Sequence, residues 1–185
     1  MNKVLEEHSK ELREALALAN MKDFHEQVAK VAQQLKEAFA AEKTVYVAGN
    51  GGSAAEAQHL SDEFLGRYRS DRRAYPVVAL TADMAAITCI ANDYGYEQVF
   101  ARQVEALGKP GDVFIGLSTS GNSENLLKAF EVARGKGMTL IAITGRQGKM
   151  REQADYVIES PADKASIVQE FHLHAIHLIC EIFEP

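Results

Sequence analysis

The segment "TVYVAGNGGSAAEAQHLSDEFL", residues 44–65, contains an apolar run, a glycine-rich turn and a helical pattern in direct succession. The apolar run at 44–49 stops where Asn50, Gly51, Gly52 and Ser53 form the turn. A strand that passes through a tight turn into a helix is the opening of a βαβ unit. This segment therefore predicts an α/β protein.

Four further apolar runs follow along the chain, and helical patterns lie between them. The runs occupy 76–80, 112–118, 139–144 and 156–160, and the helical patterns occupy 83–91, 96–107, 122–136 and 165–183. The runs are nearly continuous in Val, Ile, Leu and Ala, which is typical of strands covered on both faces. We therefore expect a doubly wound, five-stranded parallel sheet flanked by helices, of the flavodoxin-like kind.

The N-terminal residues 1–41 precede this pattern and form a helical segment of their own. Residues 2–41 contain no Pro or Gly, and apolar residues recur in them at helical spacing. This predicts two helices with a break near 20–23. With 185 residues, the chain suits a single domain, in which 1–41 is an oligomerisation segment and 44–185 the α/β core. The apolar stripes of the two helices need cover, and a partner subunit is one place for it.

The composition excludes some classes of function. The net charge is −6, which argues against a general nucleic-acid or anionic-membrane binder. A small local anion site stays open, because backbone N–H groups add no formal charge. Since no apolar run approaches ~20 residues, we expect no membrane span and a cytoplasmic location. The two cysteines, Cys89 and Cys180, lie in apolar sequence and are predicted to be buried.

The second informative turn is "LSTSGNSEN", residues 117–125, between a predicted strand and a predicted helix. Ligands of an open parallel sheet bind beyond the carboxyl ends of its strands. Four hydroxyls gather at this helix start, and unpaired N–H groups at a helix N-terminus favour an anion. One residue would be adequate for helix capping, so the cluster favours a phosphate monoester. The hydroxyl residues are Ser118, Thr119, Ser120 and Ser123.

Nucleotide motifs are absent from both turns. GxxxxGK[ST] does not occur, no lysine lies in either turn, and alanines follow Gly51 and Gly52 where GxGxxG would continue. Nucleotide binding is therefore the weaker interpretation.

Histidines and carboxylates form a second candidate site. His59 and Glu63 are four residues apart on a predicted helix and lie on one face, which suits a metal or a proton-transfer pair. The C-terminal helical pattern adds His172, His174 and His177, with Gln169 and Glu170, among apolar residues. Together these supply enough N and O ligands for zinc. The sequence pattern leaves open which of them converge.

Three segments resemble the bacterial phosphoheptose isomerase family, whose members are sugar-isomerase (SIS) domain proteins. They are "GNGGSAAEAQHLSDEFLGRYR", "CIANDYGYEQVFARQVEALGKPGDVFIGLSTSGNSENLLKA" and "IVQEFHLHAIHLICEIFE". The resemblance covers essentially the whole chain. "LSTSGNS" alone indicates only the wider superfamily, whereas His59 and Glu63 combined with Gln169 and His177 are more specific.

The resemblance implies an aldose–ketose isomerase that interconverts sedoheptulose 7-phosphate and D-glycero-D-manno-heptose 7-phosphate through an enediol. It also implies a cytoplasmic, zinc-bound homotetramer at the first step of heptose precursor synthesis for lipopolysaccharide and other glycans. By its motifs, Glu63 matches the base and His177 the acid. The matching metal positions are His59, Glu63, Gln169 and His177. The matching substrate positions are Asn50, Gly51, Gly52, Ser53, Glu63, Asn92, Asp93, Ser118, Thr119, Ser120, Ser123 and Gln169.

One geometric difficulty follows from the matching positions. Gln169 and His177 are eight residues apart, which is ~12 Å along a helix, whereas zinc–ligand bonds are ~2 Å. Both side chains must lean together, or one acts in another subunit's site, so we expect a site near a subunit interface. A carboxylate bound to zinc is also a poorer base, so Glu63 need not hold both roles in one state.

Other polar residues have plainer interpretations. His172 and His174 are expected to be satisfied interface histidines. Arg67 and Arg69 could approach the sugar phosphate, or form a surface or interface salt bridge.

Three rival functions remain open from the sequence. The first is a non-catalytic tetrameric adaptor resembling the DnaA initiator-associating protein, and the presence of Glu63 and His177 favours catalysis over it. The second is a sugar-phosphate-sensing domain, although no DNA-binding module is visible. The third is an isomerase of hexose or pentose phosphates, which the predicted phosphate site at 117–125 does not exclude by itself.

Overall fold

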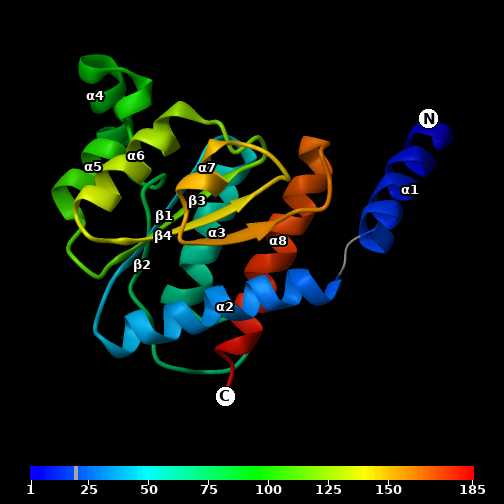
Figure 1. Ribbon diagram of the computed structural model, residues 1–185, viewed down its shortest axis with the longest axis horizontal. Coiled ribbons are helices and arrows are strands. Elements are labelled where there is room, and N and C mark those ends of the chain that lie inside the picture. The colour runs from blue at the N-terminus through cyan, green and yellow to red at the C-terminus, as the bar shows by residue number, and fades with distance from the viewer. Residues whose placement is uncertain (19–20) are drawn as a thin grey trace.

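The computed structural model describes residues 1–18 and 21–185, which form three layers around one sheet (Figure 1). The strands are β1 (Val45–Gly49), β2 (Val77–Ala79), β3 (Val113–Ser118), β4 (Thr139–Thr144) and β5 (Tyr156–Glu159). The helices are α1 (Asn2–Leu18), α2 (Met21–Ala40), α3 (Gly52–Leu65), α4 (Met84–Tyr94), η1 (Tyr96–Gln98), α5 (Ala101–Leu107), α6 (Glu124–Gly135), α7 (Lys149–Gln153) and α8 (Ala165–Ile182).

All strand pairs of the sheet are parallel, in the order β2-β1-β3-β4-β5. The order reverses direction between β1 and β3, and an open sheet binds its ligands at such a point. The turns after β1 and β3 lie side by side there, since Gly49 pairs with Leu117 at the strand ends. The predicted five-stranded parallel sheet with flanking helices and an N-terminal helix pair is confirmed.

Alternate strand residues feed two separate cores. Val45 and Val47 of β1 face the core covered by α2, α3 and α8, whereas Tyr46 and Ala48 face the core covered by α5, α6 and α7. Strands with apolar residues on both faces account for the nearly continuous hydrophobic runs in the sequence. Helix α3, which carries His59 and Glu63, therefore lies on the same side of the sheet as α8, which carries His177.

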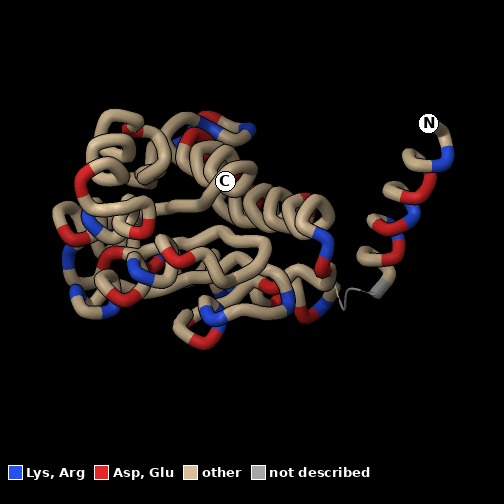
Figure 2. The backbone as a smooth tube through the Cα atoms, turned by 90° about the horizontal axis from the view of Figure 1, so that it is seen from above, with Lys and Arg blue, Asp and Glu red and all other residues tan. Residues whose placement is uncertain are grey.

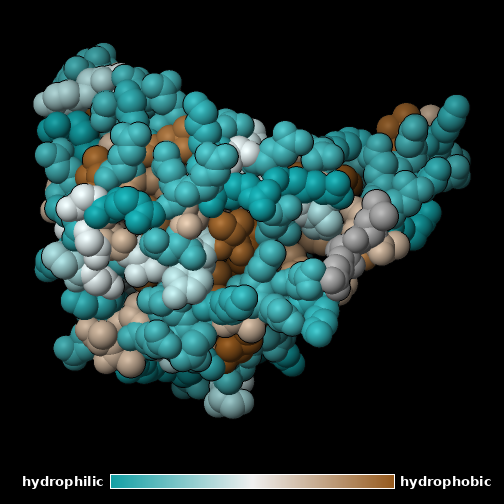
Figure 3. Space-filling model, viewed as in Figure 1, coloured by the Kyte–Doolittle hydropathy of each residue, from teal (hydrophilic) through white to brown (hydrophobic). Residues whose placement is uncertain are grey.

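The two N-terminal helices differ in what covers their apolar residues. The apolar stripe of α2, including Phe24, Val31 and Leu35, is buried in the chain's own core. On α1, Val4 and Leu5 are 69% and 62% exposed. The second half of α1 contacts the body, since Ala15 is buried and Glu11 pairs with Lys164, whereas Figures 1 and 3 show its N-terminal end projecting, with hydrophobic surface there. Only α1 therefore keeps an apolar surface for a partner. The predicted break near 20–23 falls partly on residues 19–20, which lie outside the described residues.

Helix α4 contains no buried residue, although its sequence is apolar. It lies at the outer edge of the molecule, as Figure 1 shows. Cys89 of α4 is exposed, so the prediction that both cysteines are buried is wrong for Cys89 and confirmed for Cys180. The reason is that α4 packs through Ile87, Ile90 and Ala91 alone, and Cys89 lies on its open face.

Charged residues are mixed over the surface. Figure 2 shows Lys and Arg interspersed with Asp and Glu along the described chain. Among the helices of the described ranges, none combines the length and apolarity needed to cross a membrane.

Candidate active site

The glycine turn after β1 brings the backbone close to a side chain of α8. Gly51 has φ +55°, a conformation that glycine adopts without strain. At Gly52, a Cβ would overlap the amide of Gln169. Ser53 is buried in the first turn of α3, and its N–H donates to the carbonyl of Asn50. A larger residue at position 52 would therefore have to displace the Gln169 amide from its place beside the turn.

Asn50 is held by a hydrogen-bond network that the sequence does not reveal. Its amide donates to Asn125 Oδ1 over 2.9 Å, and the Asn125 amide donates back to Asn50 Oδ1 over 2.8 Å. The Tyr96 hydroxyl also donates to Asn50 Oδ1, over 2.8 Å. These contacts join the turn after β1 to the start of α6 and to η1. They fix Asn50 at the carboxyl edge of the sheet.

The hydroxyl loop after β3 is folded tightly at this edge. Gly121 has φ +65°, and its N–H donates to Ser118 Oγ over 3.1 Å. The hydroxyls of Ser118 and Ser123 lie 3.0 Å apart. Ser123 is the N-cap of α6, yet its side chain makes no capping hydrogen bond. Helix capping by Ser123 therefore does not account for its hydroxyl, which favours the anion-binding interpretation.

Cavities lie on both sides of this loop. One of about 380 Å³ is lined by Asn50, Tyr96, Glu97, Ser123, Glu124 and Asn125. Another of about 310 Å³ is lined by Thr119, Ser120, Asn122, Gly145, Arg146, Gln147, Ala162 and Asp163. Three of the four predicted phosphate residues, Thr119, Ser120 and Ser123, therefore line open space at the carboxyl ends of the strands, whereas Ser118 is buried.

Helices α3 and α8 contact each other at three successive levels. At the first, Gly52 meets Gln169; at the second, Glu56 Oε2 lies 3.3 Å from His172 Nδ1. At the third, His59 Nε2 lies 3.1 Å from His177 Nε2. Residue numbers rise together along both helices, so α3 and α8 run in parallel away from the carboxyl edge. The third level is therefore remote from the hydroxyl loop of the same chain.

His59, Glu63 and His177 converge at this third level. His59 Nε2 lies 3.6 Å from Glu63 Oε1, and the side chain of Glu63 is 16% exposed. Two zinc–nitrogen bonds of ~2.1 Å at a tetrahedral angle would separate the nitrogens by about 3.4 Å. The 3.1 Å between the two histidine nitrogens is close to that spacing. The donor set therefore fits a zinc ion, with further positions left for other ligands.

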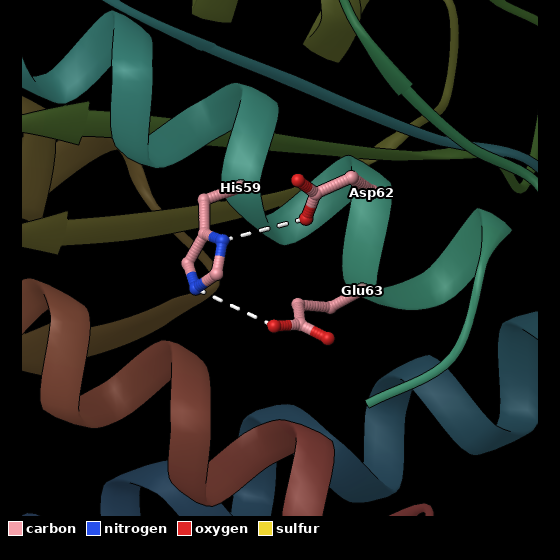
Figure 4. A group of neighbouring side chains, drawn as sticks. All are labelled: His59, Asp62 and Glu63. Atoms are coloured by element: carbon pink, nitrogen blue, oxygen red, sulfur yellow. Dashed lines mark ion pairs between the residues drawn. The ribbon is translucent and has the colours of Figure 1, made fainter. Parts of the chain in front are cut away.

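Asp62 lies on the other side of the His59 ring. Figure 4 shows the Nδ1 of His59 directed at Asp62 and its Nε2 directed at Glu63; the Nδ1 to Asp62 Oδ1 distance is 3.4 Å. The three residues form a group of possible metal ligands. The two ring nitrogens point in divergent directions, however, so one ion cannot bind Nε2 and Asp62 together. Asp62 instead suits an acceptor for Nδ1–H, which would fix the tautomer that leaves Nε2 free.

The other predicted site residues fall outside this cluster. Gln169 contacts Gly52, two helical turns from His177 in the same chain. Asn92 and Asp93 lie exposed on α4, where the Asn92 amide donates to Asp93 over 2.7 Å. In one chain, three of the four predicted metal ligands thus lie together, and Gln169 lies apart from them.

The remaining histidines are held within the chain. His172 is 1% exposed and pairs with Glu56, so it belongs to the core and not to a surface, contrary to its predicted place at an interface. His174 stacks on Phe24 with ring centroids 5.8 Å apart. Burial lowers the pKa of His174, and the charges of His25 and His177 lower it further. His174 therefore favours its neutral form.

The contacts of Arg69 and of the buried Cys180 indicate structural roles for both residues. Arg69 forms an exposed ion pair with Glu181 at 2.7 Å, which is the plainer of its two interpretations. Arg67 is exposed. Burial raises the pKa of the Cys180 thiol to about 12, and the nearby charge of Glu63 adds to the shift. Cys180 is therefore not a thiolate nucleophile near neutral pH.

Sequence reasoning missed Tyr96, Asn125, Glu56 and Arg72. Tyr96 and Asn125 lie within quoted motifs, but their partner Asn50 is 46 and 75 residues away. Glu56 could have been noticed in the sequence, because it precedes His59 by three residues on the same predicted helix.

The fold and the hydroxyl loop define the class of the protein. A family model described as "SIS domain" matches residues 8–145. SIS domains are therefore the class to which the sheet, its order and the loop after β3 belong.

Relatives within that class are more specific. A phosphoheptose isomerase of Akkermansia muciniphila is 46% identical over 169 residues, which cover 91% of this chain and 88% of that protein. A phosphoheptose isomerase of Burkholderia pseudomallei is 50% identical over 158 residues, covering 85% and 80%. The chain belongs to the phosphoheptose isomerase family and is a sugar-phosphate isomerase.

Solved structures of two relatives share the whole fold. A phosphoheptose isomerase from Francisella tularensis superimposes with a TM-score of 0.91 at 33% identity, covering 98% of this chain and 96% of that one. A phosphoheptose isomerase from Neisseria gonorrhoeae gives 0.86 at 34% identity, covering 97% of each. Both superpositions cover nearly the full length of both chains, beyond the α/β sheet.

Proposed function

We propose that this enzyme interconverts sedoheptulose 7-phosphate and D-glycero-D-manno-heptose 7-phosphate. The names of its relatives support a heptose phosphate as substrate. The observation that carries the chemistry is the convergence of Glu63 and His177 with His59, because isomerisation needs a carboxylate base and a proton carrier together. The cytoplasmic location, the homotetramer and the role in lipopolysaccharide precursor synthesis stay predictions.

We further propose that each site is shared between two subunits. Helix α3 begins at Gly52, beside the hydroxyl loop, and Glu63 lies eleven residues further along it. Eleven residues of helix span ~16 Å, which exceeds the reach of a seven-carbon sugar phosphate gripped at its end. A substrate held by Ser118, Ser120 and Ser123 of one chain would therefore meet the Glu63 of another.

Each group has a distinct task in the proposed reaction. The hydroxyl loop and the N-terminus of α6 bind the phosphate, which positions the other end of the sugar. Glu63 takes the proton from C1 of the ketose, and the electron pair moves to form the enediol. His177 exchanges protons with the oxygens on C1 and C2, since imidazole carries protons near neutral pH. Glu63 then returns its proton to C2, which gives the aldose.

Zinc would be held by His59, His177 and Glu63, with Gln169 of a neighbouring chain as the fourth ligand, and Glu63 and His177 would have to leave the ion in order to exchange protons. When bound, it would polarise the oxygens on C1 and C2. The exposed Asn92 and Asp93 on α4 would reach the site of an adjoining subunit in the same way. This arrangement removes the difficulty that Gln169 and His177 lie two turns apart in one chain.

The direct test is turnover of sedoheptulose 7-phosphate, followed by formation of the aldose, with and without a chelator. Glu63→Gln should abolish turnover while leaving the fold intact. Glu131→Gln, which neutralises an exposed carboxylate on α6, is the matched control and should be unaffected. Full activity of the Glu63→Gln variant would disprove the role of Glu63. No turnover by the wild type would disprove the substrate assignment.

A further inference from the structure

Arg72 contacts the end of α3 that carries Glu63. Its Nη2 donates to the carbonyl of Glu63 over 2.7 Å, and its Nη1 donates to the carbonyl of Arg73 over 3.1 Å. The same Nη1 lies 3.5 Å from the carbonyl of Phe64. The last carbonyls of a helix have no partner within the helix, so they need donors from elsewhere. Arg72 supplies such donors to the two residues that include the proposed base.

The guanidinium of Arg72 is enclosed. Its side chain is 7% exposed, and its Cζ lies 5.5 Å from the centre of the Phe64 ring and 5.2 Å from that of Tyr75. Its Nε has no hydrogen-bond partner among the described residues. A buried cation is costly unless it is paired, so its retention here calls for an explanation beyond filling space.

Glu184 faces Arg72 from the residues that follow α8. Its Oε1 lies 3.8 Å from Arg72 Nε, and its side chain is 12% exposed. Its Oε2 accepts from the N–H of Ser70 over 2.7 Å, and its Oε1 lies 3.4 Å from the N–H of Arg69. Glu184 therefore joins the segment after α3 to the end of the helix that carries His177.

We propose that Arg72 and Glu184 are a positioning pair for the proposed base. Arg72 fixes the backbone at Glu63, and Glu184 ties that fixed point to the end of α8, so Glu63 stays in register with His177. This inference rests on the proposed function of Glu63. It adds that the chemistry depends on two residues that act on Glu63 through its backbone and not through its side chain.

Three aromatic rings pack beside Arg72 and Glu184. The rings of Phe64, Tyr75 and Phe183 meet edge to face, with centroids 5.0 Å apart for Phe64 and Phe183. Phe183 directly precedes Glu184. The packed rings limit how far Arg72 and Glu184 can move, which makes the pair rigid enough to hold a helix end.

The test compares Arg72→Lys with Arg73→Lys in the intact enzyme. Lysine keeps the charge but lacks the planar fork that reaches two carbonyls at once. Arg73 is adjacent and exposed, and its Cζ lies 4.7 Å from the Tyr75 ring, so it is a matched control. For Arg72→Lys we expect kcat to fall about 10-fold to 100-fold with KM unchanged, because the phosphate grip is remote from this end of α3.

A second readout does not depend on the reaction. Zinc affinity, measured by competition with a chromophoric chelator, should fall for Arg72→Lys by about 10-fold, as is typical when the support of a ligand is lost. Glu184→Gln should change kcat in the same direction, and the double variant should lose less than the product of the two single effects.

The outcomes separate the two proposals. Unchanged kcat and zinc affinity for Arg72→Lys would overturn the positioning role. So would a loss that disappears when kcat is expressed per folded, assembled enzyme, or a rise in KM at constant kcat. If the wild type did not turn over sedoheptulose 7-phosphate, the proposed function would fail, whereas zinc competition would still decide the inference.

Discussion

Single residues at the carboxyl edge of the sheet set how closely neighbouring segments can pack. Gly52 shows this best, because the space next to its Cα is filled by the Gln169 amide. The residue is needed for close packing, since its φ is not in the left-handed region that restricts other residues. The two sides of this contact lie on different helices, 117 residues apart in the sequence.

Gly52→Ala should therefore displace Gln169 and weaken the site. Because the new methyl group overlaps the amide, we expect a loss of about 1–3 kcal/mol in the free energy of unfolding, as for other overpacked positions. Chemical denaturation measures that loss, and a steady-state assay should show a raised KM. Gly135→Ala is the control, since a Cβ there meets nothing within 4 Å. Equal behaviour of the two variants would contradict the role of this contact.

At the residue scale, the sequence indicated candidate site residues but not the partners that hold them in place. The hydroxyl loop and the pair His59 and Glu63 follow from short-range spacing; the structure places the loop beside a cavity and His59 Nε2 3.6 Å from Glu63 Oε1. The Asn50 network with Tyr96 and Asn125 depends on contacts between distant segments. Spacing along one chain does not contain that information.

Helices α3 and α8 are held together by the three levels of contact between them. Their middle level, Glu56 with His172, lies between the turn at Gly52 and the cluster at His59. His172 is 1% exposed, and its Nε2 has no partner among the described residues, so Glu56 alone satisfies its ring. The pair therefore sets the register of the two helices at the cost of a buried polar group.

Glu56→Ala should destabilise the protein more than an exposed substitution does. It leaves the His172 ring buried without its acceptor, which costs about 1–3 kcal/mol. Urea denaturation of Glu56→Ala and of Glu131→Ala gives the comparison. If His172→Leu combined with Glu56→Leu restored stability but not turnover, the pair would serve register and not stability alone. A Glu56→Ala variant as stable as wild type would contradict this account.

The end of α8 predicts a dependence of stability on pH. Burial alone would raise the pKa of Glu184, but hydrogen bonds from Ser70 and Arg69, with the charge of Arg72, together hold this pKa below its usual value of 4.5. A carboxyl with a lowered folded-state pKa stabilises the fold above its unfolded-state pKa and loses this contribution as the pH falls through the folded-state value. The unfolding free energies of wild type and Glu184→Gln should therefore differ near neutral pH and converge in acid. A difference that persisted or grew below that range would contradict the assignment.

At the element scale, the sequence predicted the strands and the helix at α4, but not that α4 lies exposed. The five strands follow from continuous apolar runs because both faces of the sheet are covered. The apolar residues of α4 do not lie in a core, which is why Cys89 is exposed. The spacing of apolar residues indicates which side chains are best kept from water. It does not indicate whether the chain itself or a partner covers them.

For the whole molecule, the main consequence is that one chain does not bring its hydroxyl loop and Glu63, the proposed base, together. The loop lies at the carboxyl edge, and Glu63 lies near the far end of α3. The exposed apolar residues of α1 and the exposed α4 give the chain two surfaces on which other copies could pack. The proposed sharing of each site between subunits makes assembly a requirement for turnover.

Mixed assemblies test this sharing. Glu63→Gln and a Ser118→Ala/Ser123→Ala double variant should each be inactive alone. When the two are unfolded together and reassembled, sites that take the loop from one variant and Glu63 from the other are intact, so activity should return to a substantial fraction of wild type. Reassembly of each variant by itself is the control. If mixing restored nothing while the assemblies formed, each site would lie within one chain.

The parallel course of α3 and α8 also has a consequence for turnover at low protein concentration. With sites shared as proposed, a solitary protomer would carry two half-sites and no complete site. Turnover per molecule should therefore decline on dilution, and in a cell that makes little of the protein, output should rise faster than the number of copies.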